Sequence, residues 1–488
     1  MAVGGEVAHG GGAGPRWHGT LPPLYPEWLG DRSFGEAHGV RFPYLAGEMA
    51  HGISSVELVA AMAEAEMMSL FGAGGLGHPA VERAVHTLRA RLGARPNWGV
   101  NLLHSPTEPQ AEERTAELLV SQAVPCVSLS AFMELTPAAV RCAAAGLTVD
   151  PTGRIVRPRR VMAKLSRPEV AERFLAPSPP ELLRLLVERG DLSEREARLA
   201  ALVPVAEDIT VESDSGGHTD NRPLGALLPV VRAIRDRAVL RHGYQRPVRI
   251  GAAGGLGSPP AVAAAFAAGA DYVVTGSINQ LATEAGTSGA ARKLLGGAGV
   301  ADVTMAPAAD MFELGVRVQV LSRGTLFAPR AALLHRVYSD HAGLDELSPA
   351  LRGRLEREVF GCPLETAWAQ TAAFWTERDP RELERAERDP KHLMALLFRS
   401  YLGRSSGWAT SGDPARTADY QIWCGPAIGA FNEWRAGSFL DGAEGLPVVQ
   451  IARNLLEGAT VVARAQQLRS HGVPVPPSVF TYVPRNLS

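Results

Sequence analysis

Three residues with chemically useful side chains stand next to glycines or at the end of apolar runs. His218 follows two glycines in SDSGGH, and its imidazole can gain or lose a proton near neutral pH. Lys164 ends the run RVMAKL, where its charge must pair with an acidic residue or face a ligand. Asn101, in GVNLLH, has an amide that can both donate and accept hydrogen bonds. These side chains predict proton transfer beside a polar ligand.

Glycine-rich stretches add backbone amides that could bind an anion. GAAGGLGSPP and TGSINQ each place small residues before an expected helix start, where free N–H groups suit a phosphate. AGEMA and SGGH would let the backbone approach a flat ligand. GAGGLG, residues 72–77, matches the dinucleotide-binding pattern, but no acidic residue follows at the required distance of about 20 positions. A phosphorylated ligand is therefore expected, without a Rossmann fingerprint.

The stretches that carry these residues follow short apolar runs, which alternate with amphipathic helical patterns. Eight such βα units close most economically as a (β/α)8 TIM barrel of the α/β class, with ligands at the carboxyl ends of the strands. A doubly wound open sheet is the main alternative. The expected strands are Phe42–Ala46, Met68–Phe71, Trp98–Leu102, Cys126–Leu129, Arg160–Leu165, Asp208–Val211, Val248–Gly251 and Tyr272–Val274.

Three further segments are expected outside the regular barrel. Residues 1–40 are rich in glycine and proline and predict a flexible N-terminal segment, whereas residues 41–330 contain the barrel. A helical insertion is expected near residues 179–202. Residues 331–488 predict a mainly helical C-terminal substrate or lid domain, in which the aromatic stretch around residues 408–434 is either a lid over the barrel or a linker.

Composition excludes several classes of protein. The 488 residues carry 49 basic and 51 acidic side chains, a formal charge of -2, with no basic stripe that would bind nucleic acid. The four cysteines are widely spaced, which predicts no metal site. No apolar run reaches the length of a membrane span, and no signal peptide is recognisable. We therefore expect a cytoplasmic protein without a membrane partner.

The order of the strand-end motifs resembles that of a known family. AGEMA, GVN, AKLS, SGGH, AAGG and TGS follow one another as in the flavin-dependent barrels of nitronate monooxygenases and FMN-type enoyl reductases. The longer blocks MAPAADMFELGVRVQVLSRGTLF and DYQIWCGPAIGAFNEW are similar to the PfaD branch, the trans-acting enoyl reductases of polyunsaturated fatty-acid and polyketide synthases. The resemblance extends over nearly the whole chain after residue 40.

This resemblance implies FMN as cofactor, NADPH or NADH as hydride donor, and an acyl carrier protein as partner. His218 would lie over the flavin ring as the proton donor or as a substrate-positioning group. Glu48 replaces a glycine that is commoner in the family, and we expect it to contact FMN only through its backbone. By motif position, the residues implied in cofactor binding are Gly47, Glu48, Met49, Ala50, Asn101, Lys164, Gly216, Gly217, Gly254, Gly255, Thr275, Gly276 and Ser277.

The implied reaction passes a hydride from the nicotinamide through the flavin to the β-carbon of an enoyl thioester, with the proton from His218 or from a water that it orients. Three alternatives stay open. The first is nitronate oxidation with His218 as base. The second is a non-catalytic barrel that docks on a megasynthase, and the third is a sugar-phosphate aldolase with a Schiff base on Lys164. A homodimer is also left open.

Overall fold

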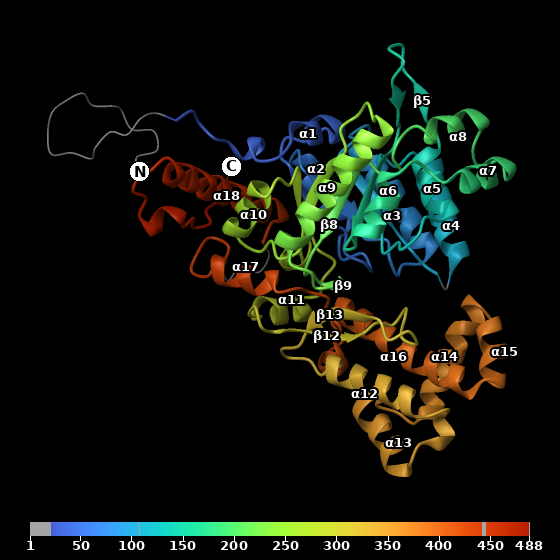
Figure 1. Ribbon diagram of the computed structural model, residues 1–488. Coiled ribbons are helices and arrows are strands. Elements are labelled where there is room, and N and C mark those ends of the chain that lie inside the picture. Colours follow the sequence, from blue (N-terminus) through green and yellow to red (C-terminus); the bar gives the residue numbers. More distant parts are fainter. Residues whose placement is uncertain (1–20, 107, 442–445, 488) are drawn as a thin grey trace.

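The computed structural model describes residues 21–106, 108–441 and 446–487, and its centre is a closed barrel of eight parallel strands (Figure 1). This architecture confirms the predicted TIM barrel. The strands pair in the order β1-β11-β10-β8-β7-β4-β3-β2, in register pairs such as Val100 with Val127. Their bounds are β1 (Tyr44–Ala46), β2 (Met68–Phe71), β3 (Trp98–Leu103), β4 (Cys126–Ser130), β7 (Arg160–Leu165), β8 (Asp208–Glu212), β10 (Arg249–Ala253) and β11 (Tyr272–Thr275).

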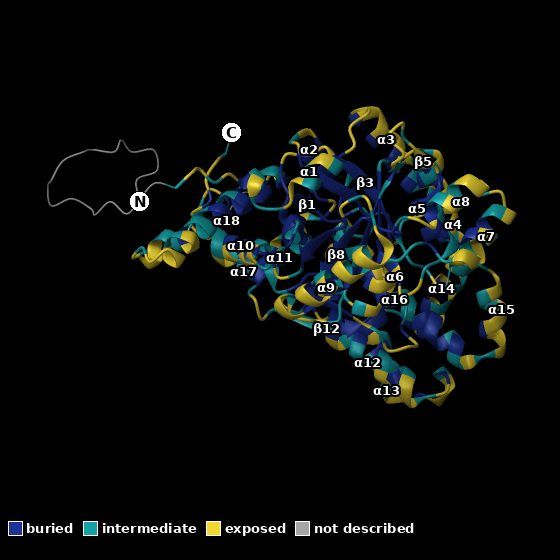
Figure 2. Ribbon diagram, turned by 45° about the horizontal axis from the view of Figure 1, so that its top comes forward, coloured by how far each residue is buried: buried dark blue, intermediate teal, exposed yellow. Residues whose placement is uncertain are grey.

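Helices cover the outside of the barrel, with their exposed faces turned to solvent (Figure 2). Ser55 caps one helix by accepting the Leu58 N–H, and Thr136 caps another by accepting that of Ala139. The expected insertion forms two further helices after β7 that pack on α5. The bounds are α2 (Val56–Glu64), α3 (His78–Leu92), α4 (Pro109–Ser121), α5 (Pro137–Ala144), α6 (Pro168–Leu175), α7 (Pro180–Glu188), α8 (Glu194–Ala200), α9 (Leu224–His242), α10 (Pro259–Ala267) and α11 (Gly289–Gly296).

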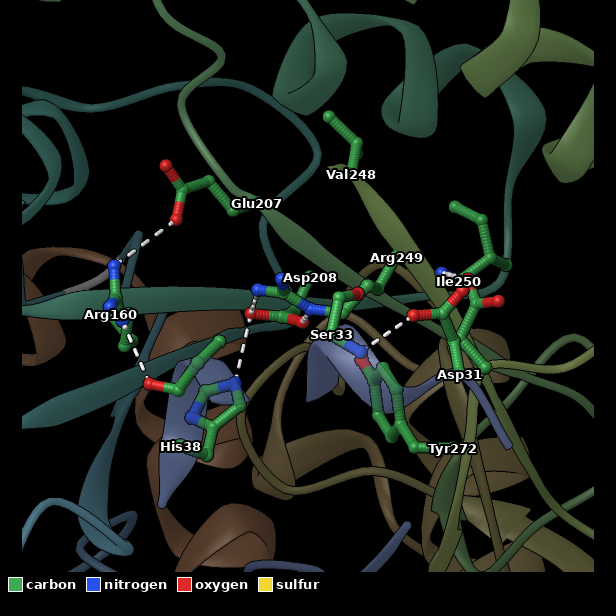
Figure 3. A network of polar contacts seen from close by, with 12 residues as sticks. Asp31, Ser33, His38, Arg160, Glu207, Asp208, Val248, Arg249, Ile250 and Tyr272 are labelled. Atoms are coloured by element: carbon green, nitrogen blue, oxygen red, sulfur yellow. Dashed lines mark hydrogen bonds and ion pairs between the residues drawn. The ribbon is translucent and has the colours of Figure 1, made fainter. Parts of the chain in front are cut away.

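A short N-terminal helix, α1 (Arg32–His38), closes the amino end of the barrel. Phe34 stacks on Tyr272 inside the barrel, with ring centroids 4.4 Å apart. The fully buried Asp208 accepts hydrogen bonds from Arg249 and pairs with His38 Nε2 at 3.1 Å (Figure 3). Residues 1–20 of the segment predicted to be flexible lie outside the described residues. Residues 32–38 differ from that expectation, because burial of Phe34 and His38 stabilises a helix there.

The second hydrophobic core is built by residues 306–402 and lies beside the barrel. It combines α12 (Phe327–Asp340), α13 (Pro349–Leu355), α14 (Leu364–Arg378) and α16 (Pro390–Ser411) with a small antiparallel sheet, and α15 (Arg381–Arg388) packs on α16 and α14. That sheet has the order β12-β13-β9, with β12 (Val303–Pro307), β13 (Arg317–Leu321) and β9 (Gly217–His218). The sequence patterns did not reveal these strands. They join the loop after β8 to a segment about 100 residues further along the chain.

The end of the chain returns to the barrel. After α17 (Ala427–Arg435), the long helix α18 (Val448–Ser470) packs against α10 and α2 (Figure 1). The sequence predicted one helical domain over residues 331–488. In the structure, α18 instead buries its apolar face on the barrel. Short pieces complete the description: a hairpin of β5 (Thr148–Val149) and β6 (Ile155–Val156), and single helical turns at Pro26–Trp28, Ser277–Leu281, Leu344–Glu346, Glu356–Phe360, Pro414–Asp419 and Pro477–Phe480. Within the described ranges, no helix has the length and apolar character needed to cross a membrane.

Candidate functional site

A cavity of about 640 Å³ opens at the carboxyl ends of the barrel strands. This volume lies in the range of roughly 300–1,000 Å³ that is usual for ligand and cofactor sites. All fourteen residues that the sequence singled out line this one cavity: Gly47, Glu48, Met49, Ala50, Asn101, Lys164, Gly216, Gly217, His218, Gly254, Gly255, Thr275, Gly276 and Ser277. The structure thus brings them together, as the barrel prediction required, while their individual roles stay predictions.

Lys164, at the end of β7, lies between two carboxylates. Its Nζ is 3.4 Å from Glu48 Oε1 and 3.4 Å from Glu212 Oε1. Burial alone would lower the pKa of Lys164, but the charges and hydrogen bonds of Glu212 and Glu48 raise it above its ordinary value. Lys164 therefore combines both expectations from the sequence, since it is paired with acidic residues and also lines the cavity.

The carboxylate of Glu48 is buried inside the barrel. Its Oε1 accepts hydrogen bonds from Ser128 Oγ at 3.0 Å and from Ser130 Oγ at 2.8 Å, in addition to the ion pair with Lys164. The two serines lie on the same face of β4, because side chains two positions apart point to the same side of a strand. The Glu48 side chain therefore organises one wall of the cavity, a role that the expectation of a backbone contact did not include, while that contact with FMN stays a prediction.

His218 is held over the cavity by the small sheet. It lies in β9, opposite Val318 of β13, and its Nε2 is 3.2 Å from the carboxylate of Asp310. Burial alone would lower the pKa of His218, but the hydrogen bond and charge of Asp310 and the charge of Glu212 raise it, against the opposing charge of Lys164. An imidazolium ion that persists near neutral pH can serve as a general acid.

The loops after β10 and β11 fit a phosphate group. Gly254 and Gly255 have φ angles of +87° and +71°, and a Cβ on Gly254 would lie 2.5 Å from Ser213 Oγ. A Cβ on Gly276 would meet no described atom within 4 Å, so the backbone there borders open space. In the part of the chain that the structure describes, the N–H groups of Gly255, Gly276 and Ser277 make no hydrogen bond. Partnerless amides of this kind can bind an anion.

Two of the expected cofactor contacts use their side chains within the protein. The Oδ1 atom of Asn101 accepts the Ala73 N–H at 2.8 Å, which leaves the Nδ2 group as its donor toward the cavity. The Oγ1 atom of Thr275 contacts Tyr44 OH and Asn279 Nδ2. The Thr275 hydroxyl is therefore engaged within the protein, and a contact of Thr275 with a phosphate stays a prediction.

The C-terminal part of the chain contributes directly to the cavity. The Trp423 ring stacks on His51, with centroids 5.3 Å apart, and both residues line the cavity. Burial lowers the pKa of His51, which favours its neutral form. Gly216 lies so close to the backbone of Cys424 that a Cβ would approach its Cα within 2.7 Å. The aromatic stretch that was left open as lid or linker is thus part of the cavity wall.

Several cavity residues escaped the sequence reasoning. Glu212 and His104 stood at the ends of expected strands, where their charge or imidazole could have been noticed. Asp310 and Trp423 carried no such signal, because they belong to segments that reach the barrel mouth only through tertiary contacts. Within the described ranges, no group of three or more His, Cys, Asp or Glu side chains is arranged to hold a metal ion.

Family models match most of the chain. The model described as nitronate monooxygenase matches residues 33–339, and the one described as the inserted helical domain of acyl-carrier-protein S-malonyltransferase matches residues 341–420. A polyunsaturated fatty acid synthase subunit from Thraustochytrium sp. is 44% identical over 91% of this chain and 30% of its own length. Polyketide biosynthesis protein PksE of Bacillus subtilis is 41% identical over 89% of this chain and 56% of its own length. The chain therefore spans only part of these relatives.

Solved structures include a similar domain. The enoyl reductase domain of MlnA, from the macrolactin biosynthesis cluster of Bacillus amyloliquefaciens, is 35% identical with a TM-score of 0.87, over 91% of this chain and 99% of that domain. FabK from Thermotoga maritima has a TM-score of 0.52 at 19% identity, over 90% of this chain and 98% of its own. The second likeness shows the shared fold alone.

Proposed function

The chain belongs to the nitronate monooxygenase family, and we propose that it is an FMN-dependent enoyl reductase. It would use NADPH or NADH to reduce the α,β-double bond of enoyl thioesters on an acyl carrier protein, in polyketide or polyunsaturated fatty-acid biosynthesis. The observation that carries this proposal is the likeness to the macrolactin enoyl reductase domain, which covers 91% of this chain and 99% of that domain. The names of the synthase relatives support the same biosynthetic setting.

The cavity supports FMN as the cofactor. The unengaged amides of Gly255, Gly276 and Ser277 would bind its phosphate, and the glycines after β8 would let its ribityl chain pass close to the backbone. Asn101 Nδ2 and the Lys164 ammonium would contact its ring. When bound, the flavin supplies the transfer of a hydride from the reduced nicotinamide to the β-carbon of the substrate. The protein contributes orientation, charge and the proton.

His218 would supply that proton. Negative charge develops on the α-carbon and the thioester oxygen of the substrate as the hydride arrives, and an imidazolium ion beside it can protonate the α-carbon. Asp310 favours the charged form of His218 and fixes its ring through Nε2. Glu212 and Glu48 hold Lys164 as an ammonium ion, so a Schiff base, which requires a neutral amine, is disfavoured.

The helical segment would receive the carrier protein. Residues 341–420 match an inserted domain of an enzyme that is named for its action on acyl carrier protein, and Trp423 and Ser406 extend from this side into the cavity. We propose residues 331–488 as the substrate and carrier-binding portion of the enzyme. A homodimer is compatible with this arrangement but is not required by it.

The purified protein tests the proposal. We expect absorption at about 450 nm from a bound isoalloxazine. We also expect NADPH oxidation that depends on an enoyl thioester such as crotonyl-pantetheine. Oxygen uptake that depends on a nitroalkane, without NADPH, would instead support nitronate oxidation, the activity for which the family is named. A colourless protein that binds carrier protein would favour a docking role.

A further inference from the structure

A second histidine–carboxylate pair lies on the cavity wall, at the end of β3. His104 lines the cavity, and its Nδ1 is 2.9 Å from Glu112 Oε2. The Glu112 side chain is 4% exposed and that of His104 is 22% exposed. The ring of His104 also packs against Phe132, with centroids 4.9 Å apart. The imidazole is thus held on two sides and open to the cavity on the third.

Glu112 is fixed as firmly as His104. Its Oε2 accepts the Ser105 N–H at 2.9 Å, and its Oε1 accepts from Thr136 Oγ1 at 2.5 Å. Burial alone would raise the pKa of Glu112, but the hydrogen bonds from His104, Thr136 and Ser105 lower it below its ordinary value. A charged carboxylate can only accept a hydrogen bond, so Nδ1 is the donor to Glu112, and in the imidazolium form of His104 the second N–H group, at Nε2, faces the cavity. Nε2 is therefore the ring nitrogen that can reach a ligand.

The two histidines approach the cavity from different strands. His218 follows β8 and His104 follows β3, and in the barrel order β7 and β4 lie between them. Lys164 ends β7, but its charge is already shared between Glu48 and Glu212. Two imidazoles, each hydrogen-bonded to its own carboxylate, therefore line the cavity from the two sides of Lys164.

We propose that His104, as an imidazolium ion, donates its Nε2–H to the thioester carbonyl oxygen of the substrate, while His218 protonates the α-carbon. This assignment rests on the enoyl reductase function proposed above. As a hydride from reduced nicotinamide adds to the β-carbon, the α,β π bond breaks and its electron pair moves onto the thioester oxygen. The Nε2–H group of His104 stabilises that oxygen. The carbonyl re-forms when the α-carbon takes the proton from His218, which regains one from solvent.

The plainer explanation is that the pair only ties the β3–α4 loop to the barrel. The structure already provides another tie, because Arg378 binds Glu108 of this loop with two hydrogen bonds of 2.7 and 2.6 Å. Two variants separate the explanations. His104→Asn places an amide near the position of Nδ1, so it keeps the bond to Glu112 and removes the group that faces the cavity. His104→Gln places an amide near the position of Nε2 instead.

The experiment compares both variants with the wild-type holoenzyme, using NADPH and crotonyl-pantetheine. For His104→Asn we expect kcat and kcat/KM to fall together by on the order of 100-fold with KM little changed, as when a single oxyanion donor is removed. For His104→Gln we expect activity within about tenfold of the wild type. Melting temperature, flavin absorbance and thioester-independent NADPH oxidation by dioxygen should stay at wild-type levels in both variants. His86→Asn, at an exposed histidine on α3, is the matched control.

Three results would overturn the assignment. Wild-type activity in His104→Asn would show that the residue serves only the loop, because this variant keeps the bond to Glu112 and lacks the cavity-facing nitrogen. Equal losses in both variants would show that a donor near the position of Nε2 is not what the reaction needs. A loss confined to KM would point to ground-state binding rather than to charge on the oxygen. Failure of the wild-type enzyme to reduce crotonyl-pantetheine or a carrier-bound crotonyl group would refute the enoyl reductase function itself, and is thus distinguishable from the first three results.

Discussion

Replacement of Asp310 by asparagine tests whether the carboxylate sets the acidity of His218. The carboxylate of Asp310 lies 3.2 Å from His218 Nε2, and the Asp310 and His218 side chains are 48% and 35% exposed, respectively. A hydrogen bond to a charged group contributes about 1.5–3 kcal/mol when it is shielded, and exposed pairs contribute about 0.2–1 kcal/mol. We therefore take about 1 kcal/mol for this half-exposed pair, which corresponds to about a fivefold loss of turnover.

The pH dependence of kcat shows in which direction Asp310 shifts the pKa of His218. A general acid works below its pKa and fails as the pH rises through it. Asp310 raises the pKa of His218, together with Glu212 and against burial and Lys164, so the wild-type enzyme keeps its acid to a higher pH. In Asp310→Asn the alkaline limb of kcat should move to lower pH.

The assay is NADPH oxidation with crotonyl-pantetheine between about pH 5 and pH 9. Asp379→Asn is the matched control, because Asp379 pairs with Arg381 on the surface. An alkaline limb that stays in place, or that moves to higher pH, would refute the pairing as the source of the acidity of His218. A loss of flavin absorbance in Asp310→Asn would instead show that the carboxylate supports the cofactor site.

Two further predictions concern the phosphate site and the base of the barrel. Gly276→Leu should give a folded but colourless protein, because the new side chain enters open space that borders the cavity; a wild-type melting temperature with retained flavin absorbance would contradict this. Asp208→Asn should cost about 3–5 kcal/mol of unfolding free energy at neutral pH, since it leaves the buried Arg249 unpaired. Burial alone would raise the pKa of Asp208, but Arg249 and His38 lower it, so this stability is present above about pH 4 and is lost on acidification. In denaturant unfolding, the difference in unfolding free energy between Asp208→Asn and the wild type should therefore become smaller below that pH. A difference in unfolding free energy that does not change with pH would contradict the assignment.

The barrel strands and the glycines at their ends were predictable from local sequence. Each buried strand is a short apolar run, and each run ends at a residue that must serve a turn or a ligand. Once the runs are closed into a barrel, residues as distant as Gly47 and Ser277 must share one rim. The grouping of the fourteen candidate residues in one cavity followed from this geometry.

The partners of those residues were not predictable in the same way. Asp310 reaches His218 only because β13 pairs with β9 across about 100 residues of sequence. Glu48 appeared to be a backbone contact, because nothing local shows that Ser128 and Ser130 lie opposite its carboxylate. The apolar face of α18 likewise gave no sign that it packs on the barrel rather than on the neighbouring helices.

The sequence by itself determined the barrel, its ligand-binding rim and the chemical character of the rim, because apolar periodicity and glycine placement are local properties of the chain. Only the tertiary structure decided which charged side chains pair with one another. The state of Lys164 depends on Glu48 and Glu212, and that of His218 depends on Asp310. Electrostatic interactions depend on distance in space and on burial, and neither can be read from separation along the chain.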